Sequence, residues 1–354
     1  MRLSSGHLFF LGILLSGMLP GLALAGPVQQ QFADWLVTCN NQNFCQARNV
    51  SHHHGLIMAL SRSAGAKDDM SLRIELGSLY APPTKLPAIN GRLLWRGKPL
   101  QLDKKSWQIT PHRLKTTNPG VITALLRKLA ADTDNSPITL AHAQGSVSLD
   151  GLKRALEFID TTQKRQGNQS AWIDPGDLPP QKTPPAPGLV TIDKPELPVA
   201  PLSATELNGL LDYGSWRMAN SHCSMDPSQR EVRVAPLSGN KAILMVSCES
   251  GAYNVVDLVW ILNREKPFHA RRIRLRLPFN WEGHDRDVEL MNTRFDDHDQ
   301  VFVTLNKGRG FADCGVTTRW RYTDEQFRLV RLASQPVCDG QETADAWPTL
   351  WVAN

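Results

Sequence analysis

The sequence lacks the short motifs by which many enzymes are recognised. It has no Gly-x-Ser-x-Gly nucleophile turn, no His-Glu-x-x-His zinc motif, no EF-hand loop and no P-loop. It also has no Cys-x-x-Cys pair, which excludes the spacing of a thioredoxin-like centre or a zinc finger. It has no block of basic residues of the kind that binds nucleic acid, and its formal net charge is only +5. The sequence therefore assigns no catalytic residue, no cofactor and no nucleic-acid partner.

Long apolar runs are missing except at the N-terminus. Residues 1–25 begin with Arg2, continue through an apolar stretch at Leu8–Leu19, and end in Ala23-Leu24-Ala25. This pattern predicts a signal peptide that is removed before Gly26, and the apolar stretch is too short to span a bilayer. We therefore expect a periplasmic protein, or a secreted one, with no membrane insertion after cleavage.

Proline is concentrated in one segment of the chain. Nine of the 24 prolines lie between Pro175 and Pro201, where they favour extended polyproline conformation over helix or sheet. The composition predicts an N-terminal domain at 26–174, a Pro-rich linker at 175–202 and a C-terminal domain at 203–354. A proline-rich strap packed on one of the domains is the alternative for this segment.

The two halves differ in their hydrophobic patterns, which together predict an α+β fold. The first half mixes expected strands at 35–39, 56–60 and 72–76 with two helices, one opened by Asn118-Pro119 and one running from Ser148 to before Gly167. The second half opens with a capping box at Ser203–Glu206 and a short helix that ends near Asp212. Its remaining segments predict a mainly antiparallel β sandwich or barrel, with strands at 231–235, 242–247, 254–262, 271–277, 288–291, 301–305, 318–322, 327–332 and 350–352.

Six cysteines in an exported chain predict disulfides. Six cysteines allow 15 pairings, but the Pro-rich segment isolates the first two, and local hairpins favour neighbours for the others. The expected pairs are Cys39–Cys45, Cys223–Cys248 and Cys314–Cys338. On the loop-closure estimate each bridge contributes about 2–3.5 kcal/mol.

Several motifs resemble a bacterial protein family, the domain of unknown function 1176. They are Lys307–Gly315, Trp320, Phe327–Val330, Cys338–Gly340, Trp347 and Leu350-Trp351, with Cys248–Asn254, Ser148–Arg165, and Phe32–Trp35 followed by Cys39 and Cys45. The opening Asp34-Trp35-x-Val37-x-Cys39 is also similar to the invasion-associated locus B proteins. The resemblance implies an exported envelope protein of Gram-negative bacteria, and it implies no activity.

A strand with alternating arginines is the first candidate site. In 271–277, Arg272, Arg274 and Arg276 are expected on one face, while the residues between them point to the core. Guanidinium groups bind phosphates and uronates through paired hydrogen bonds, which makes this face a possible anion-binding surface. The alternative is a self-satisfied charged face, because Asp285, Asp287 and Glu289 follow and could pair with the arginines across a hairpin.

Two further groups of residues have side chains that could form a site. The triplet His52-His53-His54 could bind a metal ion, but consecutive residues of one strand cannot all face one ion. The acids Asp285, Asp287, Asp296 and Asp297 could supply paired carboxylates for glycoside cleavage.

The sequence thus predicts an exported, non-catalytic module that binds an envelope protein or glycan. The alternatives are a hydrolase acting on cell-wall or surface glycan, and a metal-binding stress protein.

Overall fold

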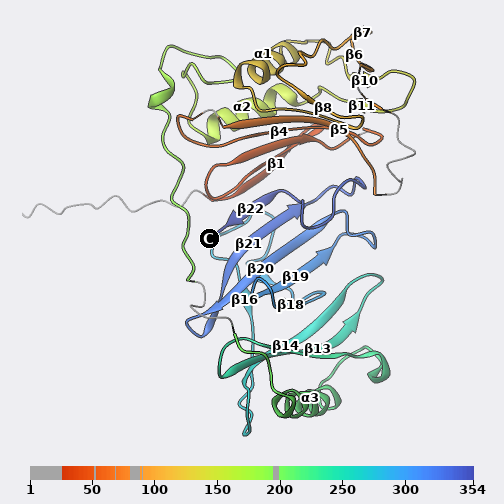
Figure 1. The fold of residues 1–354 in the computed structure, drawn as a ribbon, viewed down its shortest axis with the longest axis vertical. Coiled ribbons are helices and arrows are strands. Elements are labelled where there is room, and N and C mark those ends of the chain that lie inside the picture. Colours follow the sequence, from red (N-terminus) through yellow and green to blue (C-terminus); the bar gives the residue numbers. More distant parts are fainter. Residues whose placement is uncertain (1–25, 52, 68, 80–87, 90, 194–198) are drawn as a thin grey trace, which may run out of the picture.

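The protein is built of stacked layers in a computed structural model that describes residues 26–51, 53–67, 69–79, 88–89, 91–193 and 199–354. Figure 1 shows the order: two helices, a seven-stranded sheet, a five-stranded sheet, a four-stranded sheet and a final helix. The predicted leader, Met1–Ala25, lies outside the described residues.

The seven-stranded sheet is an antiparallel meander with strand order β1-β2-β3-β4-β5-β9-β8. Its strands are β1 (Val28–Phe32), β2 (Trp35–Cys39), β3 (Cys45–Asn49), β4 (Leu56–Arg62), β5 (Met70–Leu76), β8 (Gln108–Ile109) and β9 (Arg113–Thr116). In β2 and β4 almost every residue is buried. These two strands are therefore covered on both faces, which explains why Trp35–Val37 and Leu56–Leu60 are continuous apolar runs instead of alternating with polar residues.

Two helices and a small sheet cover the outer face of this meander. The helices are α1 (Pro119–Ala130) and α2 (Leu152–Thr162), and the small sheet has the order β11 (Ser146–Val147), β10 (Ile138–Leu140), β6 (Leu93–Trp95), β7 (Lys98–Pro99). The Asn118 side chain caps α1 by accepting the Val121 amide, as its sequence position suggests. Helix α2 starts later than predicted, because Gly151 at its N-cap adopts φ 87°, and a Cβ there would lie 1.9 Å from the Phe32 carbonyl oxygen.

The second half is a sandwich of two antiparallel sheets. One has the order β12 (Val232–Pro236), β13 (Lys241–Ser250), β14 (Val255–Asn263), β15 (Arg271–Arg272), and the other β18 (Arg294–Asp296), β19 (Val301–Lys307), β20 (Gly315–Thr323), β21 (Gln326–Gln335), β22 (Thr349–Val352). Ile243, Val259 and Ile261 of the first sheet share a core with Phe302, Trp320 and Leu332 of the second. The α+β prediction is confirmed, and within the described ranges no sheet closes into a barrel.

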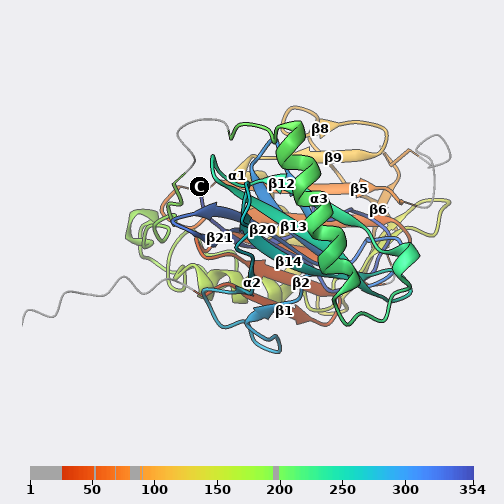
Figure 2. The ribbon, with the colours of Figure 1, turned by 90° about the horizontal axis from the view of Figure 1, so that it is seen from below.

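Helix α3 (Ala204–Ala219) packs on the outer face of the four-stranded sheet, as Figure 2 shows from below. The capping box at Ser203 and Glu206 is present. The expected end near Asp212 is wrong, because buried Leu210 and Gly214 keep the helix on the sheet. A Cβ on Gly214 would lie 2.4 Å from Val232, so the missing side chain permits the close approach.

The predicted strand at 271–277 is not continuous. Its first residues form β15, which pairs with β14, and its later residues form β16 (Leu275–Arg276), which pairs with β17 (Asp287–Val288). The segment changes its hydrogen-bonding partner because it leaves the four-stranded sheet and passes along the sandwich core. The expected alternation survives: Ile273, Leu275 and Leu277 are buried, and the arginines between them are exposed.

A polar interface joins the seven-stranded sheet to the five-stranded sheet. Asn41 exchanges two 2.9 Å side-chain hydrogen bonds with the backbone of Val352 in β22. The fully buried Arg48 of β3 forms ion pairs with Asp339, which is equally buried, and with Glu342. Glu342 also binds Arg73 at 2.7 Å. The two halves are therefore held together by charges that have little contact with water.

The described part of the Pro-rich segment is hydrogen-bonded to both halves. At its start the Leu178 amide donates to Gly167, and the Asn168 side chain donates to Pro179. Further along, Val190 forms a bridge with Ala353, and the Ile192 amide donates to Asn354. Figure 1 shows the segment running along the side of the stack. The predicted domain boundaries at 174/175 and 202/203 stay predictions.

Three disulfides crosslink the chain, and they are the three pairs that the sequence predicts. Cys39–Cys45 closes the turn between β2 and β3, Cys223–Cys248 ties the segment after α3 to β13, and Cys314–Cys338 links the start of β20 to the loop after β21. Each bridge closes a short local loop, and the sequence separations are 6, 25 and 24.

Replacing Arg48 by Met should cost about 3–5 kcal/mol of the free energy of unfolding, because it leaves the buried Asp339 carboxylate without its cation, whereas Glu342 keeps Arg73. Urea denaturation of the mature protein measures this free energy. The control is Arg113→Met on the same sheet, which removes a 2.7 Å ion pair from a side chain that is 59% exposed and should cost no more than about 1 kcal/mol. Equal losses in the two variants would contradict a stabilising role for the Arg48 pair.

The buried His53 should make stability depend on pH. Burial, with smaller effects of Arg48 and His54, lowers the pKa of His53 to about 4 from 6.5. Neutral His53 makes its full contribution to the free energy of unfolding above about pH 6.5. As the pH falls towards 4, the unfolded chain takes up a proton on this histidine before the folded protein does, so stability decreases. The full loss is about 3 kcal/mol. Urea unfolding at several pH values should show a flatter profile for His53→Gln, whereas exposed His269→Gln should keep the wild-type slope. Parallel profiles for all three proteins would contradict the assignment.

Candidate functional site

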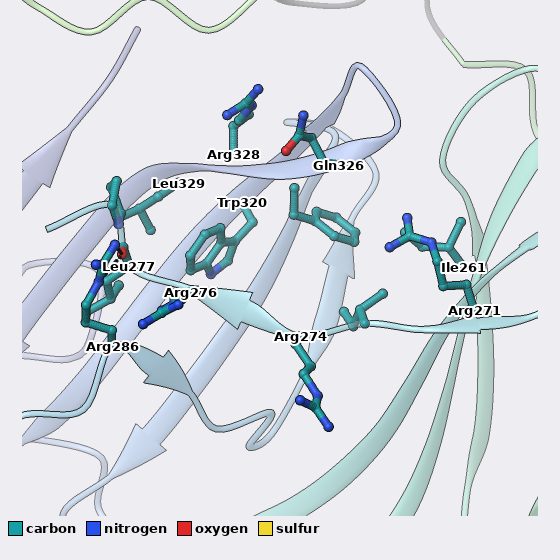
Figure 3. Close-up of a pocket in the computed structure, with 13 residues that line it drawn as sticks. Ile261, Arg271, Arg274, Arg276, Leu277, Arg286, Trp320, Gln326, Arg328 and Leu329 are labelled. Atoms are coloured by element: carbon teal, nitrogen blue, oxygen red, sulfur yellow. Dashed lines mark hydrogen bonds between the residues drawn. The ribbon is translucent and has the colours of Figure 1, made fainter.

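A groove lined by arginines lies between the segment 271–277 and the hairpin of β20 and β21. It has a volume of about 450 Å³ and is shown in Figure 3. Five arginines line it: Arg271, Arg274, Arg276, Arg286 and Arg328. No carboxylate is among its lining residues. The groove therefore concentrates positive charge without an acidic partner in its wall, which favours anions.

The floor of the groove is apolar. It is formed by the core side chains Ile273, Leu277, Trp320 and Leu329 and by the half-buried Phe327. The indole N–H of Trp320 donates to the Thr318 hydroxyl at 2.6 Å, which fixes the ring. Strand alternation explains this arrangement, because the residues that point to the sandwich core also reach the bottom of the groove.

The arginines occupy different places around this floor. In Figure 3, Arg271 lies at one end beside Ile261, while Arg276 and Arg286 lie together at the other end, near Leu277. Arg274 and Arg328 point outward from the two sides of the groove.

Two of the guanidinium groups are held by backbone carbonyls. Arg271 donates to the Glu325 oxygen at 3.0 Å, and Arg286 donates twice to the Leu277 oxygen, at 3.0 and 2.7 Å. Each retains N–H groups that these bonds do not use. Because such side chains are already ordered, binding an anion costs them less conformational entropy.

The groove contains only part of the predicted arginine face. Arg274 and Arg276 line it, but Arg272 does not; its neighbour Arg271, on the opposite face of β15, lines the groove instead. Of the expected ion pairs between these arginines and the acids that follow, one is seen in the groove. Arg276 lies 3.8 Å from Asp287, and the two side chains are 68% and 76% exposed. An ion pair so exposed contributes little, so the anion-binding role stays a prediction.

Sequence reasoning missed Arg271, Arg286 and Arg328 as members of this group. They reach the groove through the strand pairings β14–β15, β16–β17 and β20–β21. Arg286 could have been found from the sequence, because it lies next to Asp287, which was expected to pair with the 271–277 segment across a hairpin.

A second pocket, of about 340 Å³, lies on the other side of Leu277. Asp285, Asp287 and Glu289 line it together with Trp281 and His284, whose rings stack with centroids 3.6 Å apart. Burial lowers the pKa of His284. The pocket thus brings together Asp285 and Asp287, two of the four candidate acids for glycoside cleavage, with Glu289, which was expected to pair with the arginines.

The other two predicted acids, Asp296 and Asp297, do not line this pocket. Burial alone would raise the pKa of Asp296, but the Asp299 amide and Arg294 outweigh it and hold that pKa below its usual value. A general acid for glycoside cleavage needs the opposite shift.

The histidine triplet does not act as a unit. His52 lies outside the described residues, His54 is exposed, and buried His53 accepts the Gly55 amide on its Nδ1 atom at 3.0 Å. In the part of the chain that the structure describes, no three His, Cys, Asp or Glu side chains gather closely enough to hold a metal ion.

No helix among the described residues is both long and apolar enough to cross a membrane.

Comparison with known proteins identifies relatives but no activity. Residues 29–354 match the model of the family described as "Protein of unknown function (DUF1176)". The chain is 49% identical over 345 residues to "Uncharacterized protein YpfG" of Escherichia coli (strain K12), covering 98% of this chain and 97% of that protein. No solved structure matches, and neither comparison shows the similarity to the invasion-associated locus B proteins. The chain therefore belongs to the DUF1176 family, as its motifs suggested.

Proposed function

We propose that this chain is an exported, non-catalytic binding protein of the bacterial envelope, and that the arginine groove holds anionic groups of its ligand. The observation that carries the proposal is the presence of five arginines around one groove whose lining includes no carboxylate. The phosphates and uronates of envelope glycans are ligands of matching charge.

Export to the periplasm is part of the proposal. The pattern at 1–25 is typical of a signal peptide, and the three disulfides fit an oxidising compartment outside the cytoplasm.

Binding is favoured over catalysis in the groove by the kinds of side chain that line it. Apart from arginines, the lining consists of apolar residues and Gln326. It therefore has no hydroxyl or thiol nucleophile, no histidine and no carboxylate to act as a general base. Such a groove can hold and orient an anion, but it offers no group to move a proton.

The second candidate function is hydrolysis of a cell-wall or surface glycan, which the acidic pocket around Asp285, Asp287 and Glu289 favours. These three acids alternate along one chain segment. Glycosidases place two carboxyl groups on either side of the scissile bond, with one of them held protonated. A row of acids from a single segment matches that arrangement poorly, so we rank this function second.

Reversing charge in the groove should weaken binding to the envelope. The double variant Arg274→Glu, Arg276→Glu should lower the affinity of the mature protein for a purified envelope fraction about tenfold or more, because it replaces two cations by anions at the groove. Cosedimentation measures this affinity.

The matched control is Arg272→Glu, an exposed arginine of the same segment that does not line the groove and should leave the affinity unchanged. Unchanged binding of the double variant would exclude the groove as the site. Release of reducing ends from the same envelope fraction by wild-type protein, abolished in Asp285→Asn, would favour the hydrolase instead.

A further inference from the structure

We infer that the groove takes a ligand with two anionic groups, joined by a saccharide body that lies on the apolar floor between them. The inference rests on the proposed function and specifies its ligand class. It follows from where the arginines lie in relation to Trp320 and Phe327.

The positive charge of the groove is divided between two ends. Arg271 lies at one end, and Arg276 and Arg286 lie at the other, with Trp320 between them in Figure 3. Arg271 and Arg276 are five residues apart on an extended segment, so at a rise of about 3.3 Å per residue their backbones lie roughly 16 Å apart. One small anion cannot contact both ends, whereas two anions on one body can.

Each end is built around an ordered guanidinium group. Arg271 is held by the Glu325 carbonyl, and Arg286 by two hydrogen bonds to the Leu277 carbonyl. The two anchoring carbonyls belong to different elements, the β20–β21 turn and the segment after β16. The separation of the two anion positions is therefore set by the fold and not by flexible side chains alone.

The floor between the ends fits a sugar ring better than an acyl chain. Its accessible ring is that of half-buried Phe327, which lies over the core side chains of Trp320, Ile273, Leu277 and Leu329, and the floor is bounded by charge at both ends. The exposed part of the Phe327 ring can stack on the C–H face of a sugar, whose hydroxyls remain available to water and to backbone groups. A long acyl chain would run from this short apolar floor into the arginines.

A ligand in which one saccharide carries both anions should bind more tightly than a ligand with a single anion. Once the first anion is bound, the second is held near its own end of the groove at a high effective concentration. The gain depends on both ends being present, so removing either one should reduce a two-anion ligand to the affinity of a one-anion ligand.

Isothermal titration calorimetry with a matched pair of disaccharides tests this inference. The probes are trehalose 6-phosphate and trehalose 6,6′-bisphosphate, which differ only in the second phosphate, and inorganic phosphate serves as the bare anion. We expect the bisphosphate to bind wild-type protein about tenfold or more tightly than the monophosphate. Arg271→Gln, which removes one end, and the double variant Arg276→Gln, Arg286→Gln, which removes the other, should each reduce the bisphosphate to about the affinity of the monophosphate.

Arg272→Gln is the control, since its side chain is exposed on the same segment and does not line the groove. It should bind both probes as wild type does, and unchanged urea midpoints would show that all variants are folded. If wild type bound the two probes equally well, and if this binding were lost in Arg271→Gln or in the Arg276→Gln, Arg286→Gln double variant, the two-anion inference would be overturned and the proposed function would stay intact. If no probe bound, or if binding were insensitive to both groove variants, the inference and the anion-binding function would fall together.

Discussion

Burial of Ile273, Leu275 and Leu277 in the sandwich core is the constraint on which the candidate site depends. Because side chains alternate along an extended segment, the arginines between them must face outward. The same segment leaves β14 to pair with β17, and the groove lies where it passes the β20–β21 hairpin. Apolar packing thus determines where the positive charge is displayed, although the core residues carry none of it.

Arginine has two different roles in this protein, and its surroundings distinguish them. Arg48 and Arg62 are fully buried and contact carboxylates, Arg48 at the interface between the sheets and Arg62 with Asp160 of α2. Of the groove arginines, Arg271 and Arg286 instead bind backbone carbonyls, and Arg276 forms a long, exposed ion pair with Asp287. Buried arginines of the first kind are neutralised and stabilise the fold, whereas those of the second kind retain the capacity to bind an anion.

Much of the fold could be predicted because local signals were strong. The Asn118 cap, the Ser203 capping box and the alternation in 271–277 each depend on neighbouring residues only. The errors arose where distant parts of the chain meet. Helix α3 continues past Asp212 because it packs on β12 and β13, and the predicted strand 271–277 divides because two different strands offer it hydrogen bonds.

The sequence by itself determined the fold class, the three disulfide pairs and the family, since each of these follows from local patterns, from neighbouring hairpins or from motifs along the chain. Only the tertiary structure brought Arg271, Arg286 and Arg328 together with Arg274 and Arg276, removed Arg272 from the group, and placed Arg48 against Asp339. The physical reason is that strand pairing joins residues far apart in sequence, and which strands pair depends on how the whole core is buried.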